Sequence, residues 1–181
     1  HPGMKKIISA VLIMVLLYSC GSSDQQAAQV TQPLKSKQSR HNDEFNHSFG
    51  GLLAAYFELK DAFVKTDSAL VSNAASALVN AADSLQWGDL KDSTTLFETA
   101  RTFVRSIRTD AASMLMEKNL EENRKTFSTI SENLYPLIQT VRYDRQIVYH
   151  QFCPMAFNDA GAYWMSNVPE IKNPYFGDKM L

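Results

Sequence analysis

Apolar side chains recur at helical spacing through four successive segments of the chain, and this pattern constrains the fold more than any other feature. The first segment covers about residues 48–65, with apolar positions at Phe49, Leu52, Leu53, Tyr56, Phe57, Leu59 and Phe63. Charged side chains lie largely on the opposite side, as in an amphipathic helix. No alternation typical of a β-strand competes with this interpretation.

Three further segments, each preceded by residues that cap helices, cover about 66–85, 92–115 and 119–150. Asn119, followed three residues later by Glu122, resembles a capping box. Pro136 lies inside the fourth segment and is expected to kink it near Asn133. Because the breaks between segments are short, the sequence predicts an all-α fold, an up-down-up-down four-helix bundle.

The residues after His150 have a different character, because prolines and glycines occur there among six aromatic residues. The residue before a proline avoids helical geometry, so Cys153-Pro154 predicts that the fourth helix stops by about Phe152. We expect an irregular, aromatic-rich C-terminal tail that packs against the bundle. A tail of this kind is where function is to be sought.

Residues 1–19 have the pattern of a lipoprotein signal peptide, preceded by three residues, His1 to Gly3, that we expect to be foreign to the natural start at Met4. Lys5 and Lys6 are followed by an apolar run, Ile7 to Leu17, that is too short to span a membrane. The run Leu17-Tyr18-Ser19-Cys20-Gly21 resembles a lipobox, which predicts lipidation at Cys20. Gly21-Ser22 lacks the aspartate that retains some lipoproteins in the inner membrane, so we expect the outer membrane.

Residues 20–46 are polar and are expected to form a disordered tether, while residues 47–181 suffice for one domain. Without Lys5 and Lys6 the chain has 16 basic and 19 acidic side chains, and no basic stripe, which argues against a nucleic-acid partner.

His150, Cys153 and Met155 fall within six residues, and Met180 lies further along the tail. Imidazole, thiolate and thioether groups are the donors that select Cu(I), Ag(I) or Zn(II). A spacing of three residues would let His150 and Cys153 face one ion at a helix end. With Cys20 lipidated, Cys153 has no disulfide partner within the chain.

Other interpretations of these residues stay open. Cys153 and Met155 can simply fill the core, and His150 can cap the last carbonyls of its helix. A Cys153–His150 catalytic dyad lacks an orienting third residue and an oxyanion loop, so no enzyme is predicted. A second polar cluster, His41 to His47, offers two imidazoles and two carboxylates or, alternatively, a solvated lead-in to the first helix.

Two motifs in the tail together resemble a family of helical envelope domains of unknown function. They are Tyr149-His150-Gln151-Phe152-Cys153-Pro154-Met155-Ala156-Phe157 and Glu170-Ile171-Lys172-Asn173-Pro174-Tyr175-Phe176-Gly177-Asp178-Lys179-Met180-Leu181, with Gly161, Trp164 and Met165-Ser166 between them. Members occur as stand-alone lipoproteins and as extensions on periplasmic adaptor subunits of copper- and silver-type heavy-metal efflux pumps. The specific part of the similarity covers about 30 residues of the chain.

The resemblance implies metal handling, with copper as the leading ion. It points to Cys153 and Met155 as metal ligands, with His150 and Met180 as further ones. Family members usually continue past the Met-Leu pair to a second cysteine, whereas this chain stops at Leu181. A centre without that cysteine has one thiolate donor in place of two.

Two hypotheses follow. In the first, a non-enzymatic, membrane-anchored periplasmic lipoprotein binds or passes a soft metal ion such as Cu(I) through its tail, with an efflux-pump adaptor as its implied partner. In the second, an accessory or structural lipoprotein docks onto a larger envelope complex through the aromatic tail, with Cys153 packed and no metal bound.

Overall fold

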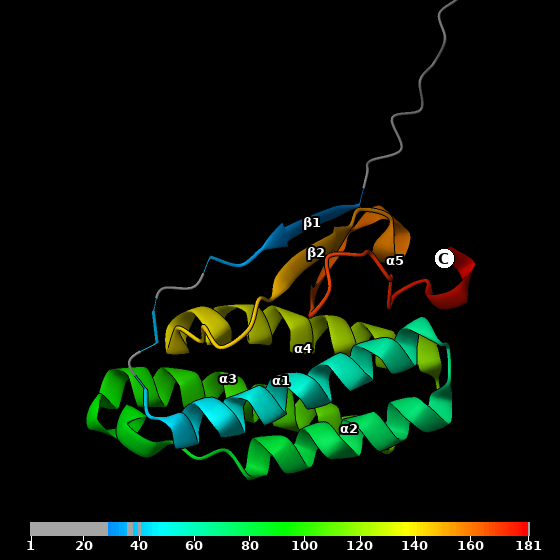
Figure 1. Cartoon of the computed structure of the whole chain (residues 1–181). Coiled ribbons are helices and arrows are strands. Elements are labelled where there is room, and N and C mark those ends of the chain that lie inside the picture. Colours follow the sequence, from blue (N-terminus) through cyan, green and yellow to red (C-terminus); the bar gives the residue numbers. More distant parts are fainter. Residues whose placement is uncertain (1–28, 36–37, 40, 181) are drawn as a thin grey trace, which may run out of the picture.

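The four amphipathic segments form the four long helices of a computed structural model that describes residues 29–35, 38–39 and 41–180. These helices are α1 (Asp43–Val64), α2 (Ser68–Asp83), α3 (Thr94–Ser113) and α4 (Leu120–Val141). Each packs against the next one along the chain, the order of contacts that an up-down-up-down connection gives (Figure 1). The predicted signal peptide and Cys20 lie outside the described residues.

Side-chain caps fix where the helices begin. Asp67 accepts a hydrogen bond from the backbone N–H of Leu70, and Asn119 caps α4, both as the sequence indicated. α1 begins earlier than predicted because Asn42 accepts a hydrogen bond from the N–H of Phe45, at 2.9 Å. A short 3₁₀ helix, η1 (Gly88–Asp92), links α2 to α3. Within the described residues, no helix combines the length and apolar composition needed to cross a bilayer.

The core lies between α1 and the other helices and is rich in aromatic rings. Tyr56 stacks on Phe127 of α4 with the ring centroids 5.2 Å apart, and Phe63 contacts the same ring at 5.1 Å. The hydroxyl of Tyr56 lies 2.7 Å from that of Ser131, also on α4. Desolvation by burial raises the pKa of Tyr56 well above its ordinary value, so this hydroxyl stays neutral.

The fourth helix is shorter than predicted. It continues past Pro136 but ends at Val141 rather than near His150, because Arg142 adopts the left-handed conformation (φ 51°) that terminates helices. The chain then turns back over α4 and becomes extended at Tyr149.

The tail is not irregular, because its central part supplies two strands of an antiparallel sheet whose third strand comes from the N-terminal segment. β1 (Val30–Pro33), β2 (Tyr149–Cys153) and β3 (Ala162–Ser166) lie in the order β1-β2-β3. Two short elements, α5 (Ala156–Asp159) and the 3₁₀ helix η2 (Gly177–Met180), complete the tail. The domain is therefore mostly helical but not all-α.

β1 comes from the segment that the sequence predicted to be a disordered tether. Val30 pairs with Phe152 and Pro33 pairs with Tyr149, so this polar stretch gains order by pairing with the backbone of β2. All four residues of β1 are exposed. A proline is tolerated there because β1 is an edge strand.

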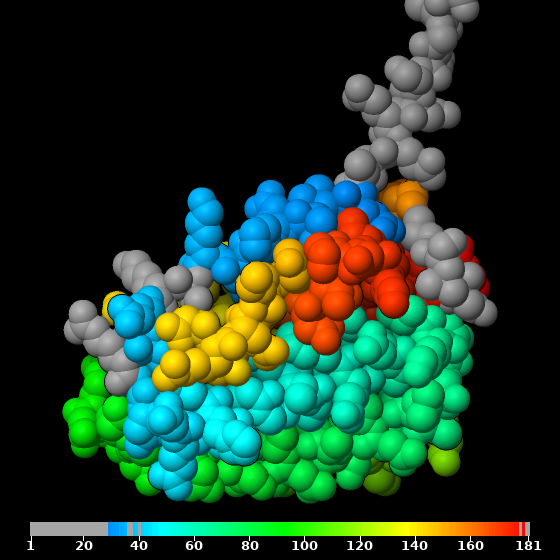
Figure 2. Space-filling view, in the orientation of Figure 1, coloured from blue at the N-terminus to red at the C-terminus, as the bar shows by residue number. Residues whose placement is uncertain are grey.

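β3 is the strand through which the sheet packs against the bundle. The backbone N–H of Met165 donates a 3.0 Å hydrogen bond to the hydroxyl of Tyr56, and β3 packs against α4 and α1. The segment that follows β3 lies between β1 and α1 in the space-filling view (Figure 2). Its carbonyls at Val168, Pro169 and Glu170 all accept from the buried Gln151 amide, at 3.1–3.2 Å.

Arg124 holds the end of the tail to the bundle. This side chain is 3% exposed and donates to the carbonyls of Pro174 (2.9 Å) and Phe63 (3.2 Å), and it forms an ion pair with Glu121. Gly177 has a positive φ of 58°, and a Cβ at this position would meet the guanidinium and the hydroxyl of Thr66. The Asn-Pro-Tyr-Phe-Gly motif thus builds a docking segment that fits around one buried arginine.

We expect Arg124→Ala to lower the free energy of unfolding by roughly 3 kcal/mol, because it leaves buried carbonyls without donors. Urea unfolding followed by circular dichroism measures this change. Arg101→Ala removes a half-exposed arginine whose nearest carboxylate oxygen, on Glu98, is 3.7 Å away, and should change stability by less than about 0.5 kcal/mol. Equal effects of the two variants would contradict the assigned role of Arg124.

Candidate functional site

Cys153 ends β2 and is completely buried. It pairs with Ala162 of β3 and shares a sheet face with Gln151, because side chains on a strand alternate between the two faces. The side-chain amide of Gln29, just before β1, lies 3.9 Å from the Cys153 sulfur. The thiol is therefore covered partly by the N-terminal segment of the chain.

His150 lies on the opposite face of β2. It occupies an even position of the strand, while Cys153 occupies an odd one, so their side chains point away from each other. The expected meeting of imidazole and thiol at a helix end was wrong, because this segment is a strand with a period of two rather than a helix with a period of 3.6. His150 neither caps a helix nor contacts the thiol.

Two tyrosines enclose the His150 imidazole. The ring of Tyr135 is 4.3 Å away at an interplanar angle of 23°, and the ring of Tyr163 is 4.4 Å away at 20°. Tyr163 is 46% exposed and also contacts Phe152. Burial lowers the pKa of His150 below its ordinary value, which favours the neutral imidazole.

Met155 follows Cys153 after one proline and lines a pocket of about 590 Å³. Its other lining residues come from the start of α4, from α5 and from the end of the tail: Glu121, Lys125, Phe157, Asn158, Asp159, Tyr175, Phe176 and Lys179. The pocket therefore combines a thioether, aromatic rings and charges of both signs.

The pocket wall contains a strained turn. Phe157, Asn158 and Asp159 have φ values of 54°, 57° and 65°, so three consecutive residues other than glycine are left-handed. Asn and Asp tolerate this conformation, but for Phe157 it costs of the order of 1 kcal/mol or more. Gly161 closes the turn at φ 78°, where a Cβ would lie 2.7 Å from the ring of Phe152. Conformations of this kind cluster at functional sites.

Two further methionines of the tail, of which only Met180 was a predicted ligand, belong to other elements. Met165 is buried on β3, where its position pairs with His150. Met180 belongs to η2, and its side chain lies outside the described part of the structure. Among the described residues, no group of three or more His, Cys, Asp or Glu side chains is placed to bind one metal ion.

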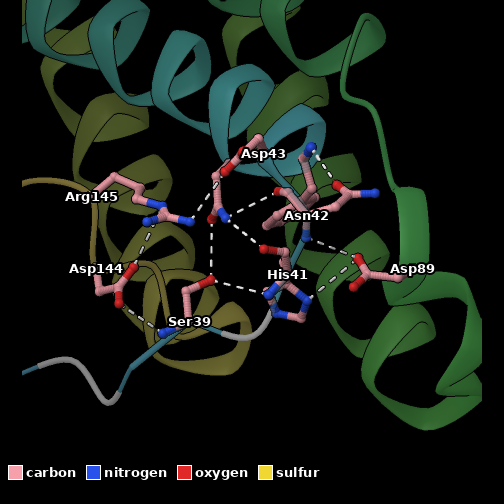
Figure 3. A network of polar contacts seen from close by, with 9 residues as sticks. Ser39, His41, Asn42, Asp43, Asp89, Asp144 and Arg145 are labelled. Carbon is pink, nitrogen blue, oxygen red and sulfur yellow. Dashed lines mark hydrogen bonds and ion pairs between the residues drawn. The ribbon is translucent and has the colours of Figure 1, made fainter.

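The polar cluster at residues 41–47 has a structural role (Figure 3). Asn42 caps α1, and its own N–H lies 3.4 Å from a carboxylate oxygen of Asp89. Ser39 donates its N–H to Asp144 at 2.8 Å, while Asn46 donates to the carbonyl of His41 at 2.9 Å. These contacts fasten the residues before α1 to η1 and to the loop after α4, so the alternative of a polar lead-in describes this segment better than a metal site.

The left-handed turn and the pocket were missed from the sequence. Asn158-Asp159 followed by Gly161 is a composition typical of turns with positive φ, and it was the available signal. The participation of Glu121 and Lys125 from α4 depends on tertiary packing that no local pattern reveals.

The depressed pKa of His150 makes stability depend on pH. The unfolded chain takes up the imidazole proton near pH 6.5, before the folded protein does, so the free energy of unfolding should fall as the pH drops below this value. His150→Gln should flatten the dependence between pH 7.5 and 5, as measured by urea unfolding. An unchanged slope in His150→Gln would show that burial between the two tyrosines does not oppose protonation of this imidazole.

A family described as a protein of unknown function, DUF3347, matches residues 52–146, slightly more than half of the chain. The match extends from α1 through α4 and so covers the helical bundle rather than the sheet. No curated protein and no solved structure shows significant similarity. The chain therefore belongs to the DUF3347 family of proteins of unknown function.

Proposed function

We propose that this chain is a non-enzymatic envelope lipoprotein, anchored through Cys20, that binds a soft metal ion at the turn formed by Cys153, Pro154 and Met155. The observation that carries the proposal is the run of three left-handed residues that begins two positions after Met155, beside the pocket that Met155 lines. A fold that keeps such a strained backbone holds the turn in one shape, which suits a preorganised ligand pair.

The donors favour copper in its reduced state. A thiolate with a thioether is a soft set that selects Cu(I) over Mg²⁺ or Ca²⁺. An ion at Cys153 would replace the contact with the Gln29 amide, and Pro154 would restrict how Met155 approaches the same ion. His150 is left out of this set because it lies on the other face of β2.

The sequence resemblance supplies the context of the proposal. Similarity of the tail to extensions on periplasmic adaptors of copper- and silver-type efflux pumps suggests that the protein holds or passes the ion near such a pump. The outer membrane is the proposed location, and the efflux-pump adaptor is the proposed partner.

A second candidate function is docking onto a larger envelope complex without metal. Two observations favour it: Cys153 is 0% exposed, and the opposite face of the sheet presents Tyr163 at 46% exposure beside His150. In this case Cys153 is a core residue, and the aromatic face would be the contact surface.

A Cu(I) competition titration under anaerobic, reducing conditions tests the metal proposal. The wild-type domain should bind one ion, and Cys153→Ser and Met155→Leu should each weaken binding at least tenfold, because each removes one of two soft donors. His150→Gln is the matched control and should bind like the wild type. Absence of binding by the wild-type domain would leave docking as the function, and loss of binding in His150→Gln would contradict the assigned ligand pair.

Thiol accessibility separates the two functions independently. A ligand cysteine should react with a thiol reagent in the metal-free domain and become protected when Cu(I) is added. A packed Cys153 should stay unreactive with or without copper and should react only after unfolding.

Mass spectrometry of the chain purified from membranes tests the anchor. We expect a diacylglycerol-type mass increase on the peptide that begins at Cys20 and its loss in Cys20→Ser. A wild-type chain without this modification would contradict the lipoprotein proposal while leaving the metal proposal intact.

A further inference from the structure

We infer that the end of the domain that carries the Cys-Pro-Met turn lies against the membrane to which the chain is anchored. This inference rests on the proposed lipidation of Cys20 but not on metal binding. It concerns a surface, here called the anchor end, formed by the start of β1, by α5 and by the α1–α2 and α3–α4 turns.

The first observation is where the N-terminal segment joins the fold. Val30 pairs with Phe152, one residue before Cys153, and Gln29 contacts the Cys153 sulfur. The chain therefore enters the domain at the end of the sheet where α5 follows β2 (Figure 1). The contact between Asn42 and Asp89 marks the opposite end of the domain. The two ends are separated by the length of α1, about 33 Å.

The second observation is the length of chain between the predicted anchor and the fold. Eight residues, 21–28, separate Cys20 from Gln29, and fully extended they span at most about 29 Å. A tether that stayed unstructured up to residue 46 would reach about 90 Å. Pairing of β1 with β2 thus shortens the reach about threefold and selects which end is nearest the bilayer.

The third observation is the placement of exposed apolar side chains. Six large apolar residues among those described are at least 40% exposed, and four of them lie on the elements that form the anchor end: Val30, Leu70, Leu115 and Met116. A fifth, Tyr163, pairs with Phe152 across from Val30. Met116 is 85% exposed in the turn between α3 and α4, next to the start of α4 that lines the pocket. Leu70 lies in the first turn of α2, beside the turn that Gly177 contacts.

A lipid surface fits this arrangement. Exposed apolar groups gathered around the entry point of a lipid-anchored chain are placed to enter the headgroup region, where each buried group adds to the hold of the anchor. The charges at this end have both signs, as Glu121, Lys125, Asp159 and Lys179 show, so the contact should be largely insensitive to salt. The Cys-Pro-Met turn would then open toward the membrane surface rather than toward the bulk periplasm.

Nuclear magnetic resonance of the lipidated chain in nanodiscs with paramagnetic headgroups tests this orientation. Broadening falls steeply with distance, so signals of Met116 and Asn158 should broaden several-fold more than those of Asp89 and Asp92. Gln32→Pro should remove this difference. Every second residue of an antiparallel strand donates its N–H to the partner strand, and because Leu34 donates to Val148, residue 32 also donates to β2. Proline has no N–H to donate, so this pairing would be lost. Gln32→Ala is the matched control and should keep it.

A second pair of variants tests the lipid contact itself. Met116→Glu should reduce the broadening at the anchor end, whereas Ile147→Glu, at a residue that is 62% exposed outside this end, should not. Equal broadening at both ends of a chain that carries lipid on Cys20 would overturn the orientation alone. A chain without lipid on Cys20 would overturn the proposed anchor and this inference together, and the copper titration distinguishes either result from a failure of the metal site.

Discussion

The buried hydroxyl of Tyr56 joins the two parts of the domain. It accepts the backbone N–H of Met165 on β3 and shares a hydrogen bond with Ser131 on α4, while its ring stacks on Phe127. Without this acceptor, β3 would bring an unpaired N–H against an apolar helix surface, at a cost of about 1–3 kcal/mol. The position of the sheet, and with it the position of the Cys-Pro-Met turn, depends on this contact.

The helical part of the fold could be predicted because its signals are local. Asp67 and Asn119 mark helix starts by their own side chains, and the apolar period of α1 identifies the face that becomes the core. β2 gave no such signal. In Tyr149 to Cys153 the buried positions include Gln151, whose side-chain NH2 group donates to three backbone carbonyls from residues 168–170, so hydrophobic alternation was absent. Likewise, β1 is a polar segment ordered by its partner strand.

The sequence indicated the residue types of the candidate site, but the expected arrangement of these residues was wrong. Cys153 and Met155 are separated only by Pro154, so their backbones lie close together whatever the secondary structure. The pairing of Cys153 with His150 depended on secondary structure, since a spacing of three residues places two side chains on one face of a helix but on opposite faces of a strand. The strained turn at Phe157 to Asp159 depends on packing around the Phe152 and Tyr175 rings, which no sequence period encodes.

Because β1 precedes the whole bundle and its partner strand follows it, the sheet joins residues about 120 positions apart, as the contact between Thr31 and Gln151 shows. The helix pairs are formed by chain neighbours and can assemble early. The long-range pairing of β1 with β2 closes a much larger loop, whose entropy cost makes it form later. During synthesis the N-terminal residues emerge first, and β1 must wait for the last fifth of the chain, which contains its partner strand. β1 therefore stays unpaired until almost the whole chain has been made, so closure of the sheet requires the complete domain.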